Sequence, residues 1–244
     1  MNEEECLNQE KLNKSTFTIS QMFNKVSTHY DFMNDLMTGF SHRLTRKKAL
    51  QLVSFRSNQR VLDLATGTGD FACLVQELLK ETEVVIGVDI SRRMLSIAKE
   101  KVRNRKFKNL ITYNLSDINH LPFRSNIFDL CTIGYGIRNV SNPSSVLKEI
   151  RRVTQKSGYL VIVEATSSSH SLIRFLSNFY FRKIIPTLAR LLFLNKKAYS
   201  YLAESIVLFP SAQKFTKMIT NTGWRKIKYF QMYLGTVTIF IAKK

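Results

Sequence analysis

The chain has 244 residues and a formal net charge of +19, from 37 Lys and Arg against 18 Asp and Glu. No apolar run reaches the ~18 residues that a membrane-spanning helix needs, and the N-terminus lacks the apolar segment of a signal peptide. The three cysteines show neither metal-ligand spacing nor a disulfide framework. A cytoplasmic protein with no bound metal is therefore expected. The length suits one α/β domain over 1–244, with an N-terminal helical region (1–55) and a helical cap (170–207).

The N-terminal region is expected to be helical. Apolar residues recur at spacings of three and four between Phe17 and Leu36, which predicts helical segments with an apolar face. This region also contains His29, Tyr30 and Asp31, whose side chains can donate or accept protons. Gly39 is expected to end the helix, and a basic helix is predicted roughly over 43–55.

A strand, a glycine turn and a helix follow. Residues 61–64 form a short apolar run, as a buried strand does, and an apolar helical pattern covers 71–79 on the other side of Gly67-Thr68-Gly69. A second strand over 84–88 ends in Asp89, 22 residues after Gly67, close to the spacing at which an acid reaches a ribose hydroxyl pair. Such units bind ligands at the carboxyl ends of parallel strands.

Two interpretations of this turn are open from the residues alone. Gly67-x-Gly69-x-x-Ala72 fits the dinucleotide pattern and keeps a nicotinamide or flavin oxidoreductase as an alternative. Asp63, inside the turn from strand to loop, favours S-adenosyl-L-methionine (SAM), because a carboxylate balances the ammonium group of that molecule.

The remaining pattern predicts a doubly wound sheet. Further strands are expected over 110–113, 128–133 and 159–163, and helices over 92–102 (with Ser91 as N-cap) and 143–153. The segment 170–207 is predicted to be helical with a break at Pro186. A helix over 211–221 and strands over 226–232 and 236–242 close the chain. The last two strands predict an antiparallel edge on an otherwise parallel sheet.

Several of these segments resemble class I SAM-dependent methyltransferases: Asp63–Asp70, Asp89, Asp117 with Leu121-Pro122-Phe123, and Phe128-Asp129. Three further motifs resemble the UbiE/MenG/COQ5 group, namely Tyr30-Asp31-x-Met33-Asn34-Asp35-Leu36-Met37, Gly136-Ile137-Arg138-Asn139-Val140, and Tyr201-Leu202-x-Glu204-Ser205-Ile206 with Phe209-Pro210. The resemblance runs from about Phe23 to the C-terminus. It implies a Rossmann-like seven-stranded fold and C-methylation of a quinone ring with SAM as methyl donor.

The resemblance also implies roles for single residues. The turn residues Gly67, Thr68 and Gly69 contact SAM, Asp89 binds its ribose, and Asp117 and Ile118 flank the adenine. Gly134 belongs to the same site, although the family usually has a serine there. The family also often has glycine at Ala65 or Thr66, and reads Leu-Lys-Pro-Gly-Gly where this chain has 154–158.

The catalytic hypothesis concerns the loop after the fourth strand. Arg138 is always cationic and can hold a phenolate-type oxygen, with Asn139 beside it. Tyr30, Asp31 and His29 are predicted to form the opposite wall. Tyr135, Arg138 and Tyr201 are predicted to contact the substrate, a polyprenyl quinol.

The charge is concentrated in two segments, 92–108 and 151–197. Within 171–193, large apolar residues alternate with the cations, which favours contact with an anionic membrane surface. A SAM-dependent RNA methyltransferase is the alternative that explains the charge through phosphate contacts, but no RNA-binding module is evident. The sequence does not decide between naphthoquinol and benzoquinol substrates, or between a monomer and a homodimer.

Overall fold

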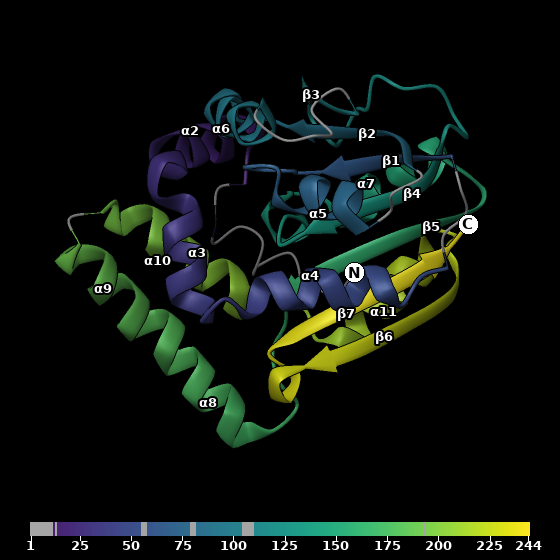
Figure 1. Cartoon of the computed structure of the whole chain (residues 1–244). Coiled ribbons are helices and arrows are strands. Elements are labelled where there is room, and N and C mark those ends of the chain that lie inside the picture. Colours follow the sequence, from purple (N-terminus) through teal and green to yellow (C-terminus); the bar gives the residue numbers. More distant parts are fainter. Residues whose placement is uncertain (1–11, 13, 55–57, 79–81, 104–109, 193) are drawn as a thin grey trace.

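The computed structural model describes residues 12, 14–54, 58–78, 82–103, 110–192 and 194–244. One sheet of seven strands has the order β3-β2-β1-β4-β5-β7-β6. Its strands are β1 (Gln59–Leu64), β2 (Thr82–Asp89), β3 (Ile111–Leu115), β4 (Phe128–Gly134), β5 (Thr154–Ala165), β6 (Arg225–Met232) and β7 (Val237–Lys243). Strands β1 to β5 are parallel, and β7 is antiparallel to both β5 and β6. The predicted fold is confirmed, with the antiparallel strand one position in from the edge (Figure 1).

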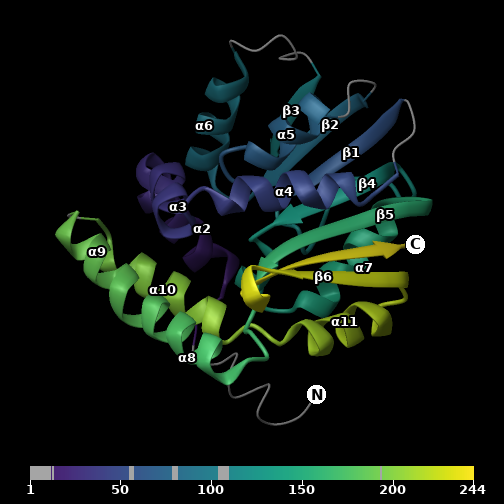
Figure 2. The same ribbon diagram turned by 60° about the horizontal axis from the view of Figure 1, so that its bottom comes forward.

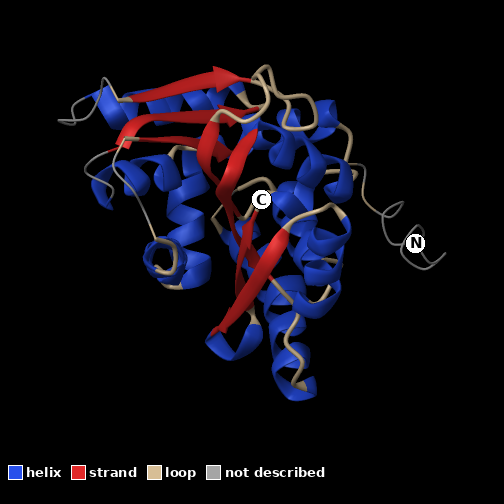
Figure 3. Cartoon of the chain, turned by 90° about the vertical axis from the view of Figure 1, so that its right-hand side faces the viewer, coloured by secondary structure: helices blue, strands red, loops and turns tan. Residues whose placement is uncertain are grey.

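Helices cover both faces of this sheet, as Figure 3 shows with the sheet near edge-on. Alternate residues of a strand point to opposite faces, so Val61 packs in the core beneath one helical layer and Leu62 in the core beneath the other. The first layer consists of α4 (Ser41–Gln51), α5 (Asp70–Leu78) and α6 (Arg92–Arg103). The second consists of α7 (Pro143–Val153) and α11 (Ala212–Asn221). The predicted N-cap is also confirmed, because Ser91 Oγ accepts a hydrogen bond from Met94 N at 3.2 Å.

The remaining helices gather at the end of the sheet where β1, β2 and β4 finish (Figures 1 and 2). They are α2 (Thr16–Val26), η1 (Ser27–His29) and α3 (Tyr30–Thr38) from the N-terminal region, and α8 (Ser171–Phe179), η3 (Tyr180–Ile184), α9 (Ile185–Leu191) and α10 (Lys196–Val207) from the cap. A separate apolar core, with Met33, Ile185 and Tyr199 among its members, joins the two groups. The N-terminal helices and the cap therefore form one layer over this end of the sheet.

The predicted break at Pro186 is wrong. The residue is at the start of α9, and helical structure continues through α8, η3 and α9. A proline crowds the carbonyl four residues earlier, here that of Arg182, which lies in the π-helical turn η3. A π turn has a wider bonding pattern than an α-helix, so it accommodates the ring. The chain instead leaves the helix after α9.

In the described ranges, no helix is long and apolar enough to span a membrane.

Candidate functional site

A cavity lies where β1, β2 and β4 end, beneath the N-terminal helices. Five of the predicted cofactor residues line it, namely Gly67, Asp89, Asp117, Ile118 and Gly134. Helix α2 closes one side, because Thr16 Oγ1 donates a hydrogen bond to Asp117 Oδ2 at 2.7 Å and Ser20 Oγ donates to the carbonyl of Ile90 at 2.9 Å. We call this the cofactor cavity.

Asp89 is held in place by backbone groups. Its Oδ2 accepts from Gly67 N at 2.9 Å and its Oδ1 from Ser91 N at 2.8 Å. Burial raises the pKa of this carboxyl group, and the backbone hydrogen bonds oppose that rise. Gly67 adopts φ +57, a conformation that glycine reaches without strain. Each carboxylate oxygen keeps capacity for another hydrogen bond, so Asp89 can accept a pair of ligand hydroxyls.

The rest of the cofactor cavity suits a flat, mainly apolar ligand part. Ile90, Met94 and Ile118 supply apolar surface beside Asp89, and the Asp117 carboxylate adds acceptors at the same end. A carboxylate that can accept from two hydroxyls suits the ribose of a nucleoside, and the apolar surface beside it suits the adenine.

A second, larger cavity adjoins the first. Its volume is about 380 Å³, and its lining includes Tyr180, Phe181, Leu202 and Ile206 from η3 and α10. Tyr30 and Tyr135 line both cavities. We call it the substrate cavity, since a ligand in it would meet a ligand of the cofactor cavity at these two tyrosines.

Arg138 forms a buried ion pair in the wall of the substrate cavity. Its Nη1 donates to Glu164 Oε1 at 2.7 Å and to the carbonyl of Tyr135 at 2.5 Å, and its Nε donates to Ser205 Oγ at 3.3 Å. The side chains of Arg138 and Glu164 are 4% and 0% exposed. The Glu164 carboxylate raises the pKa of Arg138, against the effect of burial. The guanidinium is thus held in a fixed orientation.

Two predicted residues near this pair carry buried polar atoms with no hydrogen-bond partner in the described chain. They are Asn139 Oδ1 and Tyr201 Oη. Both residues line a small cavity that Tyr30 also borders. Leaving a buried polar atom without a partner costs about 1–3 kcal/mol, so these atoms are suited to meet a polar ligand.

Comparison with known proteins identifies the family. The model of the ubiE/COQ5 methyltransferase family matches residues 9–244. The chain belongs to this family. A ubiquinone/menaquinone biosynthesis C-methyltransferase of Geotalea uraniireducens is 33% identical over 234 residues, covering 96% of this chain and 99% of the relative. Another of that name, from Shewanella frigidimarina, is 31% identical over 226 residues, covering 93% of this chain and 90% of the relative.

Solved structures agree on the fold. A SAM-dependent methyltransferase of Thermotoga maritima has a TM-score of 0.67 at 18% identity, covering 92% of this chain and 99% of its own. The [4+2]-cyclase SpnF has a TM-score of 0.64 at 16% identity, covering 94% and 97%. A cyclase among the neighbours means that the fold alone does not define the reaction. Family membership does: the protein is a methyltransferase that uses S-adenosyl-L-methionine, which decides against a nicotinamide or flavin enzyme.

Two departures from the residues usual in the family have local structural consequences. Ala65 adopts φ +47, where the family often has glycine. At Gly134, a Cβ atom would lie 2.9 Å from the Phe71 ring and 3.1 Å from Arg46 Nε. The serine that the family usually has at that position would therefore crowd two neighbours in this chain.

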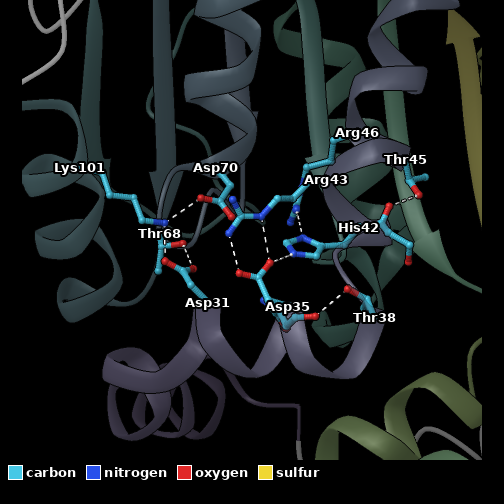
Figure 4. Close-up of polar contacts among 12 residues, drawn as sticks. Asp31, Asp35, Thr38, His42, Arg43, Thr45, Arg46, Thr68, Asp70 and Lys101 are labelled. Atoms are coloured by element: carbon cyan, nitrogen blue, oxygen red, sulfur yellow. Dashed lines mark hydrogen bonds and ion pairs between the residues drawn. The ribbon is translucent and has the colours of Figure 1, made fainter.

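Asp31 and Thr68 lie beside the cofactor cavity rather than in its lining, and their side chains face each other (Figure 4). Thr68 Oγ1 donates to Asp31 Oδ1 at 2.6 Å, and Lys101 Nζ bridges Asp31 and Asp70 at 2.5 and 2.7 Å. These contacts connect α3 to the glycine turn and to α5 and α6. In this structure Asp31 holds the N-terminal helices against the sheet.

Gly69 and His29 are also outside the lining. Gly69 has φ +81, and a Cβ atom there would collide with the Tyr113 hydroxyl, so the position must be glycine for packing. His29 is exposed at the start of α3 and lines none of the cavities found among the described residues. The structure does not bring His29 together with Tyr30 and Arg138.

Asp63 is fully buried behind the glycine turn. Its oxygens accept from Thr132 Oγ1 at 2.7 Å and Thr66 Oγ1 at 2.5 Å, and it does not line the cofactor cavity. Burial raises its pKa to about 6, although the two hydroxyl hydrogen bonds act in the opposite direction. The carboxyl group ties β1 to β4 and to the turn.

This raised pKa predicts a pH-dependent cost. An unfolded aspartate releases its proton near pH 4, whereas folded Asp63 keeps it up to about pH 6. The folded state therefore loses stability as pH rises through this window. We expect the free energy of unfolding of the wild type, relative to Asp63→Asn, to fall by about 3 kcal/mol between pH 4 and pH 7 in urea titrations. A constant difference would contradict this assignment.

Sequence reasoning missed the contribution of α4. His42 and Arg46 are 2% and 7% exposed and both line the substrate cavity. The sequence predicted only a basic helix roughly over 43–55, and Phe55 lies outside the described residues. A signal was present: positions 42, 45, 46, 49 and 50 share one helical face, and the structure buries all of them.

Proposed function

We propose that the protein transfers a methyl group from SAM to a ring carbon of a reduced polyprenyl quinone. The favoured reaction converts demethylmenaquinol to menaquinol, with 2-methoxy-6-polyprenyl-benzoquinol as a further substrate. The observation that carries the proposal is the junction at Tyr30 and Tyr135, where the cofactor cavity, which suits a nucleoside, meets the larger substrate cavity, which is mostly apolar. The names of the two relatives support the same reaction class.

Bound SAM supplies an electrophilic methyl group that needs no activation by the protein. The chain must align the ring carbon, stabilise the charge on the adjacent ring oxygen, and allow the ring proton to leave. Tyr30 and Tyr135 flank the place where the ring carbon would lie. Asn139 lines the cofactor cavity, and Tyr201 lines the small cavity rather than the substrate cavity. From there Tyr201 can donate a hydrogen bond to a ring oxygen and Asn139 Oδ1 can accept one, since neither atom has a partner in the described chain. The buried pair of Arg138 and Glu164 fixes the loop that carries Asn139.

The test is methyl transfer from labelled SAM, with reduced demethylmenaquinone, a reduced benzoquinol precursor and bulk RNA as parallel acceptors. We expect label in menaquinone. Label in the benzoquinol product alone would keep the reaction class and change the pathway. Label in RNA alone would overturn the proposal and make the +19 charge the determining feature.

We further propose that the protein works in the cytoplasm and contacts the membrane through α8. Leu172, Phe175, Leu176 and Phe179 recur at helical spacing and are 66%, 67%, 52% and 53% exposed. Between Ser171 and Leu192 the sequence has four Lys or Arg and no acid, which complements an anionic lipid surface and disfavours pairing with a second copy. Leu176 also lines the substrate cavity, so this surface adjoins the opening through which a polyprenyl tail would enter.

Vesicle binding tests this surface. Replacing both Phe175 and Phe179 by serine should weaken binding to anionic vesicles at least about tenfold, because each ring contributes on the order of 1.5–3 kcal/mol when buried in lipid. The matched control replaces two exposed leucines at the β3 edge of the sheet by serine, Leu110 just before β3 and Leu115 at its end. Equal losses for the two double variants, or no vesicle binding by the wild type at low salt, would refute the membrane contact.

A further inference from the structure

Arg46 is a buried cation without a carboxylate in ion-pair contact, although its charge acts to lower the pKa of the buried Asp63 and half-buried Asp70 carboxyl groups. It is 7% exposed, and no carboxylate forms an ion pair with it in the described chain. Its Nη1 is 2.5 Å from His42 Nδ1, whereas its Nε is buried and has no hydrogen-bond partner among the described residues. A buried charge in this state is costly unless a ligand completes its contacts.

The neighbouring side chains fix the direction of this guanidinium (Figure 4). Arginine only donates hydrogen bonds, so His42 Nδ1 must be the acceptor, and the ring proton is then on Nε2. Nε2 donates to Asp35 Oδ1 at 2.8 Å, and Arg43 holds the same carboxylate with contacts of 2.9 and 2.6 Å. Burial and the Arg46 charge both lower the pKa of His42, which keeps the ring neutral. Asp35 and His42 are positioning residues for Arg46.

The guanidinium lies close to the junction of the two cavities. Its central carbon is 5.2 Å from the centre of the Tyr135 ring, which belongs to both linings. Its Nε would be 3.1 Å from a Cβ atom at Gly134, the last residue of β4. A side chain at Gly134 would therefore crowd Arg46, so the absence of the usual serine leaves room for this cation. Arg46 lines the substrate cavity and not the cofactor cavity.

We propose that Arg46 binds the ring oxyanion of the reduced quinone, beside the carbon that receives the methyl group. This inference rests on the proposed function. The quinol hydroxyl releases its proton to solvent, and the negative charge stays on the oxygen next to Arg46. The ring carbon forms its bond to the methyl group as the methyl–sulfur bond breaks, and that carbon then releases its own proton to solvent. A fixed cation stabilises the oxyanion that makes the ring carbon nucleophilic.

Other ionisable groups also lie near Arg46, and their protonation would contribute to any pH dependence of oxyanion binding. They are His42 on its own helix, Asp63 at the end of β1, Asp70 on α5 and Tyr135 after β4. Asp35 on α3 is connected to Arg46 through His42. A carboxylate of bound SAM is a second anionic oxygen that a cation could hold. The experiment therefore measures cofactor and substrate separately.

The variants are Arg46→Gln, Arg46→Lys and a matched control, Lys47→Gln, which removes an exposed charge from the same helix. Three quantities are measured: the Kd of SAM, kcat/KM for a short-tailed reduced demethylmenaquinone, and the pKa of naphthol bound in the presence of S-adenosylhomocysteine, read from its naphtholate absorbance. For Arg46→Gln we expect kcat/KM to fall about tenfold to a hundredfold, the cost of losing a charged hydrogen bond. The Kd of SAM should stay within about twofold, and the pKa of bound naphthol should rise.

Arg46→Lys keeps the charge and should recover part of both losses, so it remains informative if Arg46→Gln does not fold. Lys47→Gln should match the wild type. A loss confined to SAM affinity, or unchanged kcat/KM and naphthol pKa in Arg46→Gln, would overturn the assignment. If the wild type methylates no hydroquinone but Arg46 still lowers the pKa of bound naphthol, the oxyanion site stands and the proposed substrate is wrong.

Discussion

Replacing Glu164 by alanine is expected to lower the free energy of unfolding by about 3–5 kcal/mol, since it leaves a buried guanidinium without its counter-ion. The carboxylate is fully buried and bonds Arg138 Nη1 at 2.7 Å, Arg138 N at 3.3 Å and Ala165 N at 2.8 Å. Urea unfolding with an unchanged m value would measure the loss directly.

A second variant separates charge from packing. Changing the pair together, Arg138→Met with Glu164→Leu, should regain most of the lost stability, because apolar residues of similar volume remove both buried charges. Glu164→Gln, which keeps an acceptor oxygen, should lie between the wild type and Glu164→Ala. If Glu164→Ala costs less than about 1 kcal/mol, the pair does not hold the loop in the way described.

The same variants bear on the catalytic role predicted for Arg138. A double variant that is stable but inactive would assign a catalytic role to the Arg138–Glu164 pair. A stable and active double variant would reduce Arg138 to a structural residue and leave substrate-oxygen binding to Arg46. The distinction matters because Glu164 neutralises the charge of Arg138, whereas Arg46 has no ion-pair partner in the described chain.

The fold was predictable because its determinants are local. Short apolar runs followed by helical periodicity define the parallel strands, and Asp89 and Asp117 follow strands whose carboxyl ends meet at one edge. The closing hairpin was equally readable from its two β-rich runs. The continuous helix through Pro186 was not, since it depends on the π-helical turn that accommodates the proline ring.

The site was only partly predictable because its charges are paired across long sequence separations. Asp31 was expected in the catalytic wall, yet Lys101 and Thr68 engage it. Arg46 was expected only as part of a basic helix over roughly 43–55, because its environment depends on Gly134 and Tyr135, almost ninety residues later in the chain. No local pattern indicates which cation has no ion-pair partner, because this depends on how distant segments pack.

Replacing Asp89 by alanine is expected to weaken SAM binding about a hundredfold while leaving the fold intact. The carboxylate is the acceptor that we assign to the ribose hydroxyls, and hydrogen bonds to a charged group contribute roughly 1.5–3 kcal/mol. Its contact to Gly67 N holds the glycine turn and its contact to Ser91 N holds the start of α6, so some stability is also lost. Calorimetric titration with S-adenosylhomocysteine measures the affinity, and the melting curve of the ligand-free variant measures the structural part.

A modified ligand serves as the control that separates the lost ribose contact from the lost stability. The 2′-deoxy analogue of S-adenosylhomocysteine should bind the wild type more weakly than the parent compound, but bind Asp89→Ala about equally well, since the group that recognised the hydroxyl is gone. An analogue penalty that persists in Asp89→Ala would place the ribose contact elsewhere in the cofactor cavity. Asp117 would then be the next acceptor to test, because it is the other carboxylate among the described lining residues.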